Sequence, residues 1–590
     1  MFANNPLTYL VQKMWKYAET NRPKIIVYVV LSVIANIIHS GDTLIIGLLL
    51  NTIQKQGIHQ SNIWLLFLIL GIFIVAEVLF WILHGPSRVM ENTNAFIVRN
   101  NYKRFLLKGV ADLPVEWHTD HHSGDTIDKI EKGTEALFNF SQNTFQLITA
   151  AISLITSFIA LVYFDVSIGI ITAILTIITL RILYFFDQKL IPGYRDVNRM
   201  ENTVAEKVYD AFSNITTVII LRIESLVLGS ISDAMNRSHD QYLENHKNNE
   251  LKWFSAGVLG RLIVIVTIAV YIFTHINQGT ILAGTIFIVY SYGDQLRKTF
   301  SNFAALYSQI VKQRVSVANS EELSEHFLSE KDNRENHLPK KWNTITIKDL
   351  SFSYHTEEGA DLHVNDVSLM IKKGERVAVI GESGGGKSTF LKLFRDLYHP
   401  KHVELLVDTK KSAQNFASIR DSISLIPQDP EIFATTIREN ITVGVNYSDK
   451  HIKKYTDIAC FSEVVKRLPH GLDSSIVEKG VNLSGGEKQR LALARGLLAS
   501  EDKDILLLDE PTSSVDMSNE LIIYQNIFSG FKGKTIISSI HRLHLLSLFD
   551  TIHFFKNGKI IASGSFDELK EHSADFQVLW ERYIKTRDNF

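Results

Sequence analysis

The chain has 590 residues, of which 46% are hydrophobic and 21% are charged, and its formal net charge is −2. This length allows several domains, the composition excludes a globally disordered chain, and the near-neutral charge gives no basic signature for a nucleic-acid partner. With one cysteine, Cys460, no internal disulfide is possible, and we expect that thiol to be a small buried side chain.

The chain begins with an amphipathic segment. Residues 5–19 (NPLTYLVQKMWKYAE) mix apolar and charged positions, and the start lacks the compact apolar region and small-residue cleavage site of a secretory signal peptide. We expect a helix of the kind that lies at a membrane surface.

Long apolar runs dominate residues 25–300. A helix needs roughly 20 apolar residues to cross the hydrocarbon core of a bilayer, and the candidate spans are 25–50, 63–83, 140–163, 166–186, 253–274 and 280–296. The last is the weakest because YSYGDQLRK interrupts it. A buried soluble helix can be this apolar, but so many long runs predict an all-α polytopic domain in a lipid bilayer.

Positive charge alternates along these spans. Lys and Arg precede the first span and follow the second, fourth and sixth, whereas the turn near Asp165 and the turn at 275–279 have none. The positive-inside rule therefore predicts that both termini are cytoplasmic. The polar segments 84–139 and 187–252 are helical in pattern, and we expect them to continue the membrane helices into the cytoplasm.

A hydrophilic stretch at 319–342 separates the apolar half from a half with the composition of a soluble domain. The predicted organisation is a transmembrane domain over 1–318, a linker over 319–342 and a soluble domain over 343–590.

The soluble half contains a candidate phosphate-binding loop. RVAVI at 376–380 reads as a β-strand, GESGGGKST follows at 381–389, and the next residues are helical in pattern. In the spacing G-x-x-x-x-G-K-[ST], glycines let backbone amides approach phosphate oxygens, the lysine reaches the β- and γ-phosphates, and the hydroxyl binds Mg²⁺. These residues are Lys387 and Ser388. A glycine-rich turn without a ligand is the alternative, and the strand–loop–helix order argues against it.

Two further strands end in polar residues suited to hydrolysis. ILLLDE at 505–510 ends in Asp509 and Glu510, and KTIISSI at 534–540 is followed by His541. The carboxyl ends of such strands lie where ligands bind in doubly wound sheets. Asp509 would bind Mg²⁺, Glu510 would orient or deprotonate the attacking water, and His541 would contact the γ-phosphate. Each alone could be an ordinary polar residue at a strand end, but together they predict a nucleotide hydrolase.

Further motifs carry a resemblance to a known family. LSFSY (350–354), IPQDPEIFATTIREN (426–440), LSGGEKQR (483–490), SSVD (513–516) and HRL (541–543) resemble the aromatic loop, Q-loop, signature, D-loop and switch histidine of ABC transporters. The whole chain resembles an exporter-type half-transporter. The resemblance implies a multidomain fold, with about six transmembrane helices followed by an α/β P-loop NTPase domain, the ABC nucleotide-binding domain, over 343–590.

The resemblance also implies an ATPase that uses ATP and Mg²⁺. Tyr354 would stack on adenine, and Gln428 would sense Mg²⁺ and the γ-phosphate. The implied catalytic residues are Glu510, His541, Lys387 and Gln428, and the implied metal ligands are Ser388, Gln428 and Asp509. The implied nucleotide-binding residues are Tyr354, Gly381, Glu382, Ser383, Gly384, Gly385, Gly386, Lys387, Ser388, Thr389, Gln428, Ser484, Gly485, Gly486, Glu487, Asp516 and His541.

The signature motif is expected to act on a second chain. Ser484, Gly485 and Gly486 stand where a helix begins, which is a ready anion site. The resemblance implies that two nucleotide-binding domains meet head to tail, with each signature closing on the ATP of the other. A full set of motifs in one chain favours a homodimer. Glu487 departs from the family pattern, which most often has glutamine.

Two polar loops resemble the family's cytoplasmic coupling loops, EWHTDHHSGDTI (116–127) and FSNITTVIILRIE (212–224). The histidines at 118, 121 and 122 allow a metal site as an alternative, but docking is a sufficient explanation for this loop.

Charges inside the spans are candidates for a cargo cavity, because they are costly in lipid. These are His39, Asp42, Glu77 and Arg261, whereas Arg181 lies near a cytoplasmic end and is expected to extend to the interface. Pairing between helices, such as Asp42 with an arginine, is the alternative. The mixed signs select no substrate.

The predicted function is ATP-driven export or flipping of a hydrophobic, amphipathic or peptide-like substrate across a membrane, by default a bacterial inner membrane. Two alternatives remain open: import of a metal chelate by an exporter fold, and one half of a heterodimeric exporter. An ABC ATPase acting on nucleic acid or ribosomes is a third, against which the apolar spans and the neutral charge argue.

Overall fold

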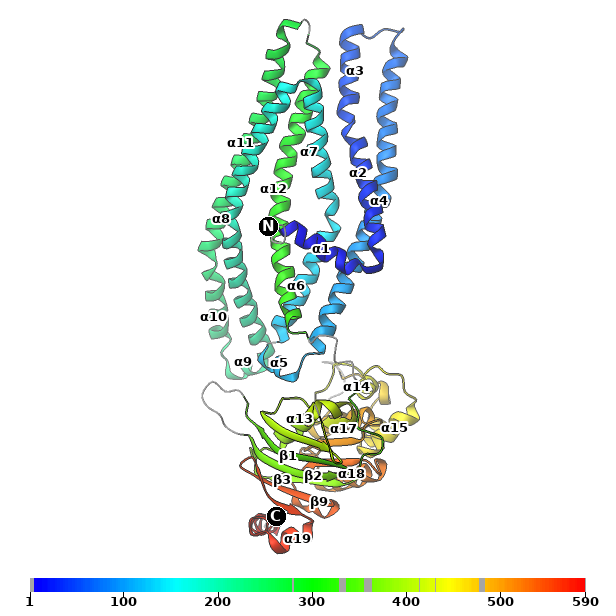
Figure 1. Cartoon of the computed structure of the whole chain (residues 1–590), viewed down its shortest axis with the longest axis vertical. Coiled ribbons are helices and arrows are strands. Elements are labelled where there is room, and N and C mark those ends of the chain that lie inside the picture. Colours follow the sequence, from blue (N-terminus) through cyan, green and yellow to red (C-terminus); the bar gives the residue numbers. More distant parts are fainter. Residues whose placement is uncertain are drawn as a thin grey trace. The chain divides into compact units, whose positions relative to one another are not determined.

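The computed structural model describes residues 5–121, 123–278, 281–327, 336–354, 363–412, 414–429, 431–476 and 483–588. The chain divides into two compact units, one of residues 1–113 and 117–328 and the other of residues 114–116 and 329–590. The first is all helical and the second is built on β-sheets (Figure 1). The predicted linker 319–342 includes the end of the last helix of the first unit, and its limits stay a prediction.

The first unit is a bundle of long helices joined by short ones. The helices are α1 (Pro6–Ala18), α2 (Arg22–Ser40), α3 (Asp42–Gln56), α4 (Ile63–Ala111), α5 (Val115–Asp120), α6 (Ser123–Gln142), α7 (Thr144–Phe164), α8 (Val166–Ser213), α9 (Ile215–Leu221), α10 (Glu224–Arg237), α11 (His239–His275) and α12 (Ala283–Glu325). At 1.5 Å per residue, α4 and α8 are each over roughly 70 Å long, far more than a hydrocarbon core of about 30 Å. They therefore contain both an apolar span and a polar extension.

Five helical segments in the described part of the chain are long and apolar enough to cross a membrane: Pro6–Gln56, Ile63–Ala111, Ser123–Phe164, Val166–Ser213 and Glu224–His275. These contain the first five predicted spans. The sixth prediction, 280–296, falls largely on α12, which packs along α3, α7 and α11 but is less apolar. Asp294 explains part of this, because it carries charge into α12 and pairs there with Arg297 at 2.7 Å and Lys298 at 3.1 Å.

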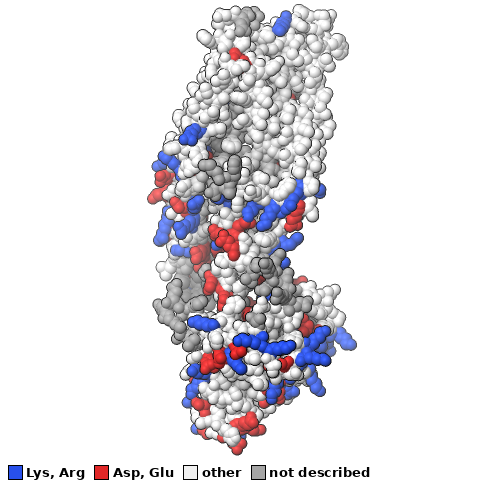
Figure 2. All heavy atoms as spheres, viewed as in Figure 1, with Lys and Arg blue, Asp and Glu red and all other residues white. Residues whose placement is uncertain are grey.

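Apolar and charged side chains lie on different parts of the surface of this unit. In Figure 2, one end of the helical bundle shows almost no charged side chains, and Lys, Arg, Asp and Glu gather over the other end of the same helices. Helix α1 buries Leu10, Met14 and Tyr17 against neighbouring helices, as an amphipathic helix should. Its predicted place at a membrane surface stays a prediction.

The second unit contains two sheets. The smaller, antiparallel one has the order β2-β1-β4-β5, from β1 (Thr344–Phe352), β2 (Val364–Lys372), β4 (His402–Val407) and β5 (Lys410–Lys411). The larger has the order β10-β9-β3-β8-β7-β6, from β3 (Arg376–Gly381), β6 (Ile423–Ile426), β7 (Ile505–Asp509), β8 (Thr535–Ser539), β9 (Thr551–Lys556) and β10 (Lys559–Gly564). All its pairings are parallel except β10 with β9.

Helices pack against this larger sheet or against one another. They are α13 (Lys387–Phe394), α14 (Ile437–Thr442), α15 (Asp449–Ile458), α16 (Ser462–Arg467), α17 (Gly485–Ala499), α18 (Met517–Gly530), α19 (Phe566–His572) and α20 (Ala574–Asp588). Every residue of β7 is buried, and its side chains alternate between two cores. Leu506 packs in the core that includes α17 and α18, and Leu507 in the core that includes Phe390 of α13. Burial on both faces explains why this strand is a continuous apolar run.

Candidate functional site

The ends of three neighbouring parallel strands form the site. Strands β3, β8 and β7 lie side by side in the sheet, so the loop after β3, His541 after β8, and Asp509 and Glu510 at the end of β7 share one edge. From the sequence we expected these groups to lie together, and the strand order puts the ends of the three strands next to one another.

The loop between β3 and α13 requires glycine at specific points. Gly381 and Gly386 have φ values of +145° and +99°. A Cβ on Gly381 would lie 2.1 Å from the carbonyl oxygen of Phe555, and one on Gly386 would lie 2.4 Å from that of His363. Both sites therefore need glycine for conformation and for space.

Lys387 lies inside this loop. Its Nζ donates hydrogen bonds to the carbonyl oxygens of Gly381 at 2.9 Å and Glu382 at 3.0 Å. Burial lowers the pKa of Lys387, and the nearby carboxylates of Glu510 and Asp509 oppose that effect. The loop thus curls around a buried ammonium group that faces two acids.

A second cluster joins Ser388, Asp509 and Ser539. The Ser388 and Ser539 hydroxyls donate to Asp509 Oδ1 at 2.9 Å and 2.8 Å. A hydroxyl and a carboxylate are hard oxygen ligands of the kind that Mg²⁺ prefers. Ser388 and Asp509 therefore fit a magnesium ion next to the loop.

Glu510 is the point at which three segments meet. Its Oε2 accepts a hydrogen bond from Gln428 Nε2 at 3.0 Å, and its Oε1 lies 2.7 Å from His541 Nε2. Its backbone has φ +46°, and its N–H donates to Ser539 Oγ at 3.0 Å. His544, the other histidine near this strand end, instead faces Glu520 at 3.5 Å.

Tyr354 lies in a group of aromatic rings. Its ring is perpendicular to those of His363, Phe352 and Tyr398, with centroid distances of 4.8, 4.9 and 5.2 Å. These contacts fix the ring that the sequence assigned to adenine stacking. Residues 355–362 lie outside the described residues.

The signature motif begins α17. Ser484 is its N-cap, and Glu487 completes a capping box: Ser484 N donates to Glu487 Oε2 at 2.8 Å, and Glu487 N donates to Ser484 Oγ at 3.3 Å. Glu487 also forms an ion pair with Arg467. Although burial opposes it, hydrogen bonds from Ser484 and Arg467 lower the pKa of Glu487. The unusual residue of the motif is thus a charged cap, a position at which glutamic acid and glutamine are both suitable.

Gln489 is a site residue that sequence reasoning missed. Its Nε2 donates to Ser513 Oγ at 2.9 Å and to the carbonyl oxygens of Gln428 and Glu510 at 3.3 Å each. Its Oε1 accepts from Ser514 N at 2.8 Å. Gln489 therefore links the signature helix to the Q-loop, the end of β7 and the D-loop. The sequence signal that could have found Gln489 is its position within the signature motif LSGGEKQR.

The D-loop leads into α18. Asp516 is the N-cap of that helix, and its Oδ1 accepts a hydrogen bond from Asn519 N at 3.0 Å. Arg542, the residue after His541, donates to the carbonyl oxygens of Val515 at 2.7 Å and Ser513 at 3.2 Å. Arg542 is a second residue without an assigned role in the sequence reading, and it ties the segment after β8 to the D-loop.

The predicted coupling loops are helical. Residues 116–127 fall mostly on α5 and the start of α6, and 212–224 contain α9. The His121 ring stacks on Trp117 at 4.1 Å, and His118 meets the same ring edge-on at 5.2 Å, whereas residue 122 lies outside the described residues. In the described part of the chain, the cluster suited to a metal is His39, Asp42 and Glu77, not these histidines.

The four cavity candidates separate into a cluster and an isolated residue. His39, Asp42 and Glu77 lie together, and Asp42 pairs with His39 at 3.3 Å rather than with an arginine. Arg261 is exposed on α11, and Arg181 is exposed on α8.

These features define a membrane-domain ATPase: long apolar helices in one unit, and a phosphate loop beside a carboxylate pair in the other. Two family models match the chain, "ABC transporter transmembrane region" over residues 25–300 and "ABC transporter" over residues 364–513. Together these ranges cover more than half of the chain. The protein belongs to the ABC transporter family, and it is an integral membrane protein with an ATP-binding domain.

Curated relatives match along nearly the whole chain. A β-(1→2)glucan export ATP-binding/permease protein of Brucella abortus is 25% identical, with 97% of this chain and 94% of the relative covered. A multidrug resistance-like ATP-binding protein of Buchnera aphidicola is 26% identical, with 92% and 91% covered. An ATM1-type heavy metal exporter of Novosphingobium aromaticivorans is 25% identical, with 84% and 81% covered.

A solved structure shares the fold. It is described as a bacterial Atm1-family ABC exporter with ATP bound, and it superposes with a TM-score of 0.83 at 21% identity, over 95% of this chain and 99% of that chain. The comparisons confirm the predicted exporter-type half-transporter and its ATPase activity. Half-transporters of this family act as dimers in the membrane. The names of the glucan and heavy-metal relatives and of the solved structure describe export, which does not favour the import alternative.

Proposed function

We propose that two copies of this chain form a homodimeric exporter, in which each Mg²⁺–ATP lies between the P-loop of one copy and the signature motif of the other. The observation that carries the proposal is the first turn of α17. Ser484 and Gly485 are exposed, and a Cβ on Gly485 would meet only open space. This turn therefore presents backbone amides outward, toward an anion from another molecule.

Within this turn, Ser484 and Glu487 form a capping box that satisfies each other's backbone N–H group. Ser484 exchanges hydrogen bonds with Glu487 and accepts one from Lys488 N at 2.9 Å, and none of these bonds reaches the P-loop among the described residues. Because the chain carries every motif, including Glu487 in a stable cap and Glu510 at the strand end, a second copy supplies all that the shared site needs. A heterodimer with another half-transporter requires a partner that no feature of this chain selects.

The residues of the site divide the work of hydrolysis. Lys387 and the P-loop amides hold the β- and γ-phosphates, and Tyr354 stacks on adenine. Ser388, Asp509 and Gln428 would hold Mg²⁺, which would neutralise charge on the phosphate oxygens. Gln428 and His541 hold the carboxylate of Glu510 in place, and Glu510 orients and deprotonates the attacking water. His541 also contacts the γ-phosphate.

ATP binding drives closure of the dimer because the closed state contacts each nucleotide from both sides. Shifting an equilibrium from about 1:99 to 99:1 takes roughly 5.5 kcal/mol of differential affinity, a modest demand on two shared ATP molecules. Hydrolysis removes the link through the γ-phosphate and returns the dimer to the open state. The coupling loops around α5 and α9 transmit this change to the membrane helices.

The cargo class we propose is hydrophobic, amphipathic or peptide-like, moved outward across a bacterial inner membrane. The large exposed apolar surface of the helices supports contact with lipid-soluble molecules. The relatives named above are described as a glucan exporter, a multidrug resistance-like protein and a heavy metal exporter, so their names do not narrow the class of cargo. The distribution of Lys and Arg along the chain supports cytoplasmic termini.

A mixed-dimer experiment tests the shared site. Lys387→Ala removes one P-loop, and Ser484→Arg blocks one signature, so each homodimer should lack ATPase activity. Mixed dimers, isolated through two different affinity tags, retain one P-loop facing one intact signature. They should recover up to about half of the wild-type rate, because an isologous dimer has two equivalent sites. Mixed dimers as inactive as both parents, or an active Ser484→Arg homodimer, would contradict the arrangement.

A further inference from the structure

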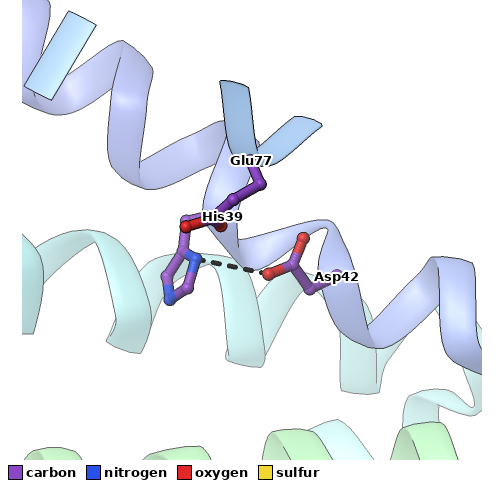
Figure 3. Close-up of side chains that lie close together, drawn as sticks. All are labelled: His39, Asp42 and Glu77. Atoms are coloured by element: carbon purple, nitrogen blue, oxygen red, sulfur yellow. Dashed lines mark ion pairs between the residues drawn. The ribbon is translucent and has the colours of Figure 1, made fainter. Parts of the chain in front are cut away.

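Three side chains with metal-binding groups converge inside the membrane-spanning segments. His39 is the second-last residue of α2, Asp42 is the first residue of α3, and Glu77 lies within α4. One ligand atom from each lies within 4.8 Å of the other two. Figure 3 shows the three side chains turned toward one another, with His39 Nδ1 3.3 Å from an oxygen of Asp42.

The cluster lies deep in the apolar region. Asp42 begins α3, which ends at Gln56, and Glu77 follows the start of α4 at Ile63 by a similar length of helix. At 1.5 Å per residue both acids are about 21 Å along their helices from the short connection between α3 and α4. That depth is inside a hydrocarbon core of about 30 Å. The first span is also interrupted at this point, by Gly41 between α2 and α3.

In the described part of the chain, no lysine or arginine pairs with the acids of the cluster. Several other acids of the helical unit face lysine or arginine: Glu91 faces Arg88, Asp187 faces Lys252, and Asp294 faces Arg297. Asp165 faces a histidine, His275. Asp42 forms an ion pair with His39, and Glu77 forms none with the described residues. Two carboxylates side by side at this depth are expensive unless a cation joins them.

The geometry is close to that of a metal site. Ligand distances of about 2.0–2.2 Å in a tetrahedral zinc site place ligand atoms about 3.4 Å apart. His39 and Asp42 already have that separation, at 3.3 Å. No separation in the cluster exceeds 4.8 Å, so the ligand atoms of Glu77 need to approach the others by at most about 1.4 Å.

Neighbouring aromatic residues orient two of the ligands. Trp81 Nε1 donates a hydrogen bond to Glu77 Oε1 at 2.8 Å, which holds the carboxylate in place. The His39 ring packs against Phe80 with a centroid distance of 5.1 Å. Metal sites use such contacts to fix the direction of imidazole and carboxylate ligands.

We propose that His39, Asp42 and Glu77 bind a divalent transition-metal cation of the Zn²⁺, Co²⁺ or Mn²⁺ class. One imidazole and two carboxylates neutralise two positive charges and suit this class better than a soft ion that requires thiolate. Three protein ligands leave a coordination position open to water or to a group of the cargo. This site is independent of the shared ATP site, because none of its residues belongs to the nucleotide-binding domain.

The test uses the purified full chain in lipid nanodiscs, freed of metal by chelation. Co²⁺ is titrated and followed by its visible absorption, and Zn²⁺ is then added as a competitor. The variants His39→Gln, Asp42→Asn and Glu77→Gln each remove one ligand and keep a side chain of similar size. His84→Gln is the matched control, because His84 stacks on Phe80 at 4.8 Å but lies outside the cluster.

The wild type and His84→Gln should bind one Co²⁺ per chain that Zn²⁺ displaces. Each cluster variant should bind at least about tenfold more weakly, since losing a ligand costs no less than losing a residue that orients one. Size-exclusion profiles identify any variant that fails to fold, and the other two variants then carry the test. Absence of binding in the wild type, or equal binding in well-folded cluster variants through other histidines, would overturn the proposal. ATPase activity, measured with Mg²⁺ alone, reports separately on the nucleotide site.

Discussion

Arg467 forms an ion pair with Glu487, and the carboxylate of Glu487 also caps the helix that carries the signature motif. In the proposed dimer this turn approaches a γ-phosphate. A carboxylate at that place repels the phosphate unless a cation compensates it. Arg467 is the cation that the chain supplies, from the end of α16, twenty residues earlier in the sequence.

Removing Arg467 should therefore weaken the shared ATP site. We expect Arg467→Gln to raise the KM for ATP about threefold to fivefold, a modest effect because the Arg467 side chain is 65% exposed and water screens it. Glu487→Gln in the same chain should restore the KM, since glutamine keeps the cap and removes the charge. Steady-state ATPase assays measure both. Lys466→Gln, next to Arg467 but paired with Glu463, is the control. Without rescue in the double variant, charge compensation is the wrong explanation.

Glu510→Gln should keep ATP binding and nearly abolish turnover. Glutamine preserves the shape of the side chain and can still contact Gln428 and His541, but it cannot accept a proton from water. We expect a loss of roughly 10²- to 10⁴-fold in kcat, and accumulation of closed dimers with ATP bound. Glu463→Gln makes the same change on an exposed helix of the domain and should behave as the wild type. Wild-type turnover by Glu510→Gln would remove this residue from the catalytic role.

The sequence predicted those parts of the site whose signals are local. A strand followed by a glycine-rich loop, or by two acids, is contained in a few consecutive residues, so the P-loop, Asp509 and Glu510 were placed on the correct strand ends. Gln489 and Arg467 were not assigned roles, because their partners are distant in sequence and meet them only when α17 packs beside β7 and the D-loop. Such contacts are products of tertiary packing rather than of any short pattern.

Hydropathy had a similar limit in the helical unit. It located the apolar spans, since length and composition alone decide whether a helix can cross a bilayer. It did not reveal the interruption at Gly41, because a single glycine inside an apolar run breaks a helix only in some packing contexts. From the sequence we named His39, Asp42 and Glu77 as separate candidates for a cargo cavity. The packing of α4 against the junction of α2 and α3 brings them together.

Ser388→Ala should raise the Mg²⁺ requirement of the ATPase. The substitution removes the hydroxyl that lies 2.9 Å from Asp509 and leaves the proposed ion with one fewer oxygen ligand. We expect half-maximal activity at a Mg²⁺ concentration about tenfold higher or more, by the usual cost of a metal ligand. Ser388→Thr is the matched control, because it keeps a hydroxyl that the P-loop pattern accepts. Equal Mg²⁺ dependence in Ser388→Ala and the wild type would argue against this ligand.

His553 makes the stability of the nucleotide-binding domain depend on pH. It lies buried in β9, where Nδ1 is 2.8 Å from Ser563 Oγ, and in the described structure Nε2 has no hydrogen-bond partner. Burial lowers the pKa of His553 from 6.5 to about 4. Above pH 6.5 both the folded and unfolded states are neutral at this residue, so it has no effect there. As the pH falls from 6.5 to 4, the unfolded state gains the proton first, and unfolding becomes easier by about 1.4 kcal/mol per pH unit.

At pH 5 this amounts to about 2 kcal/mol, which corresponds to roughly 4–8 °C in Tm for a domain of this size. His553→Gln cannot titrate, so its Tm should fall by that much less than the wild-type Tm between pH 7 and pH 5. Thermal unfolding of the full chain in detergent measures the difference, because acids elsewhere contribute equally to both proteins. His470→Gln, an exposed histidine of the same domain, should keep the wild-type pH dependence. If His553→Gln loses as much stability as the wild type on acidification, the buried imidazole is not the group that senses pH.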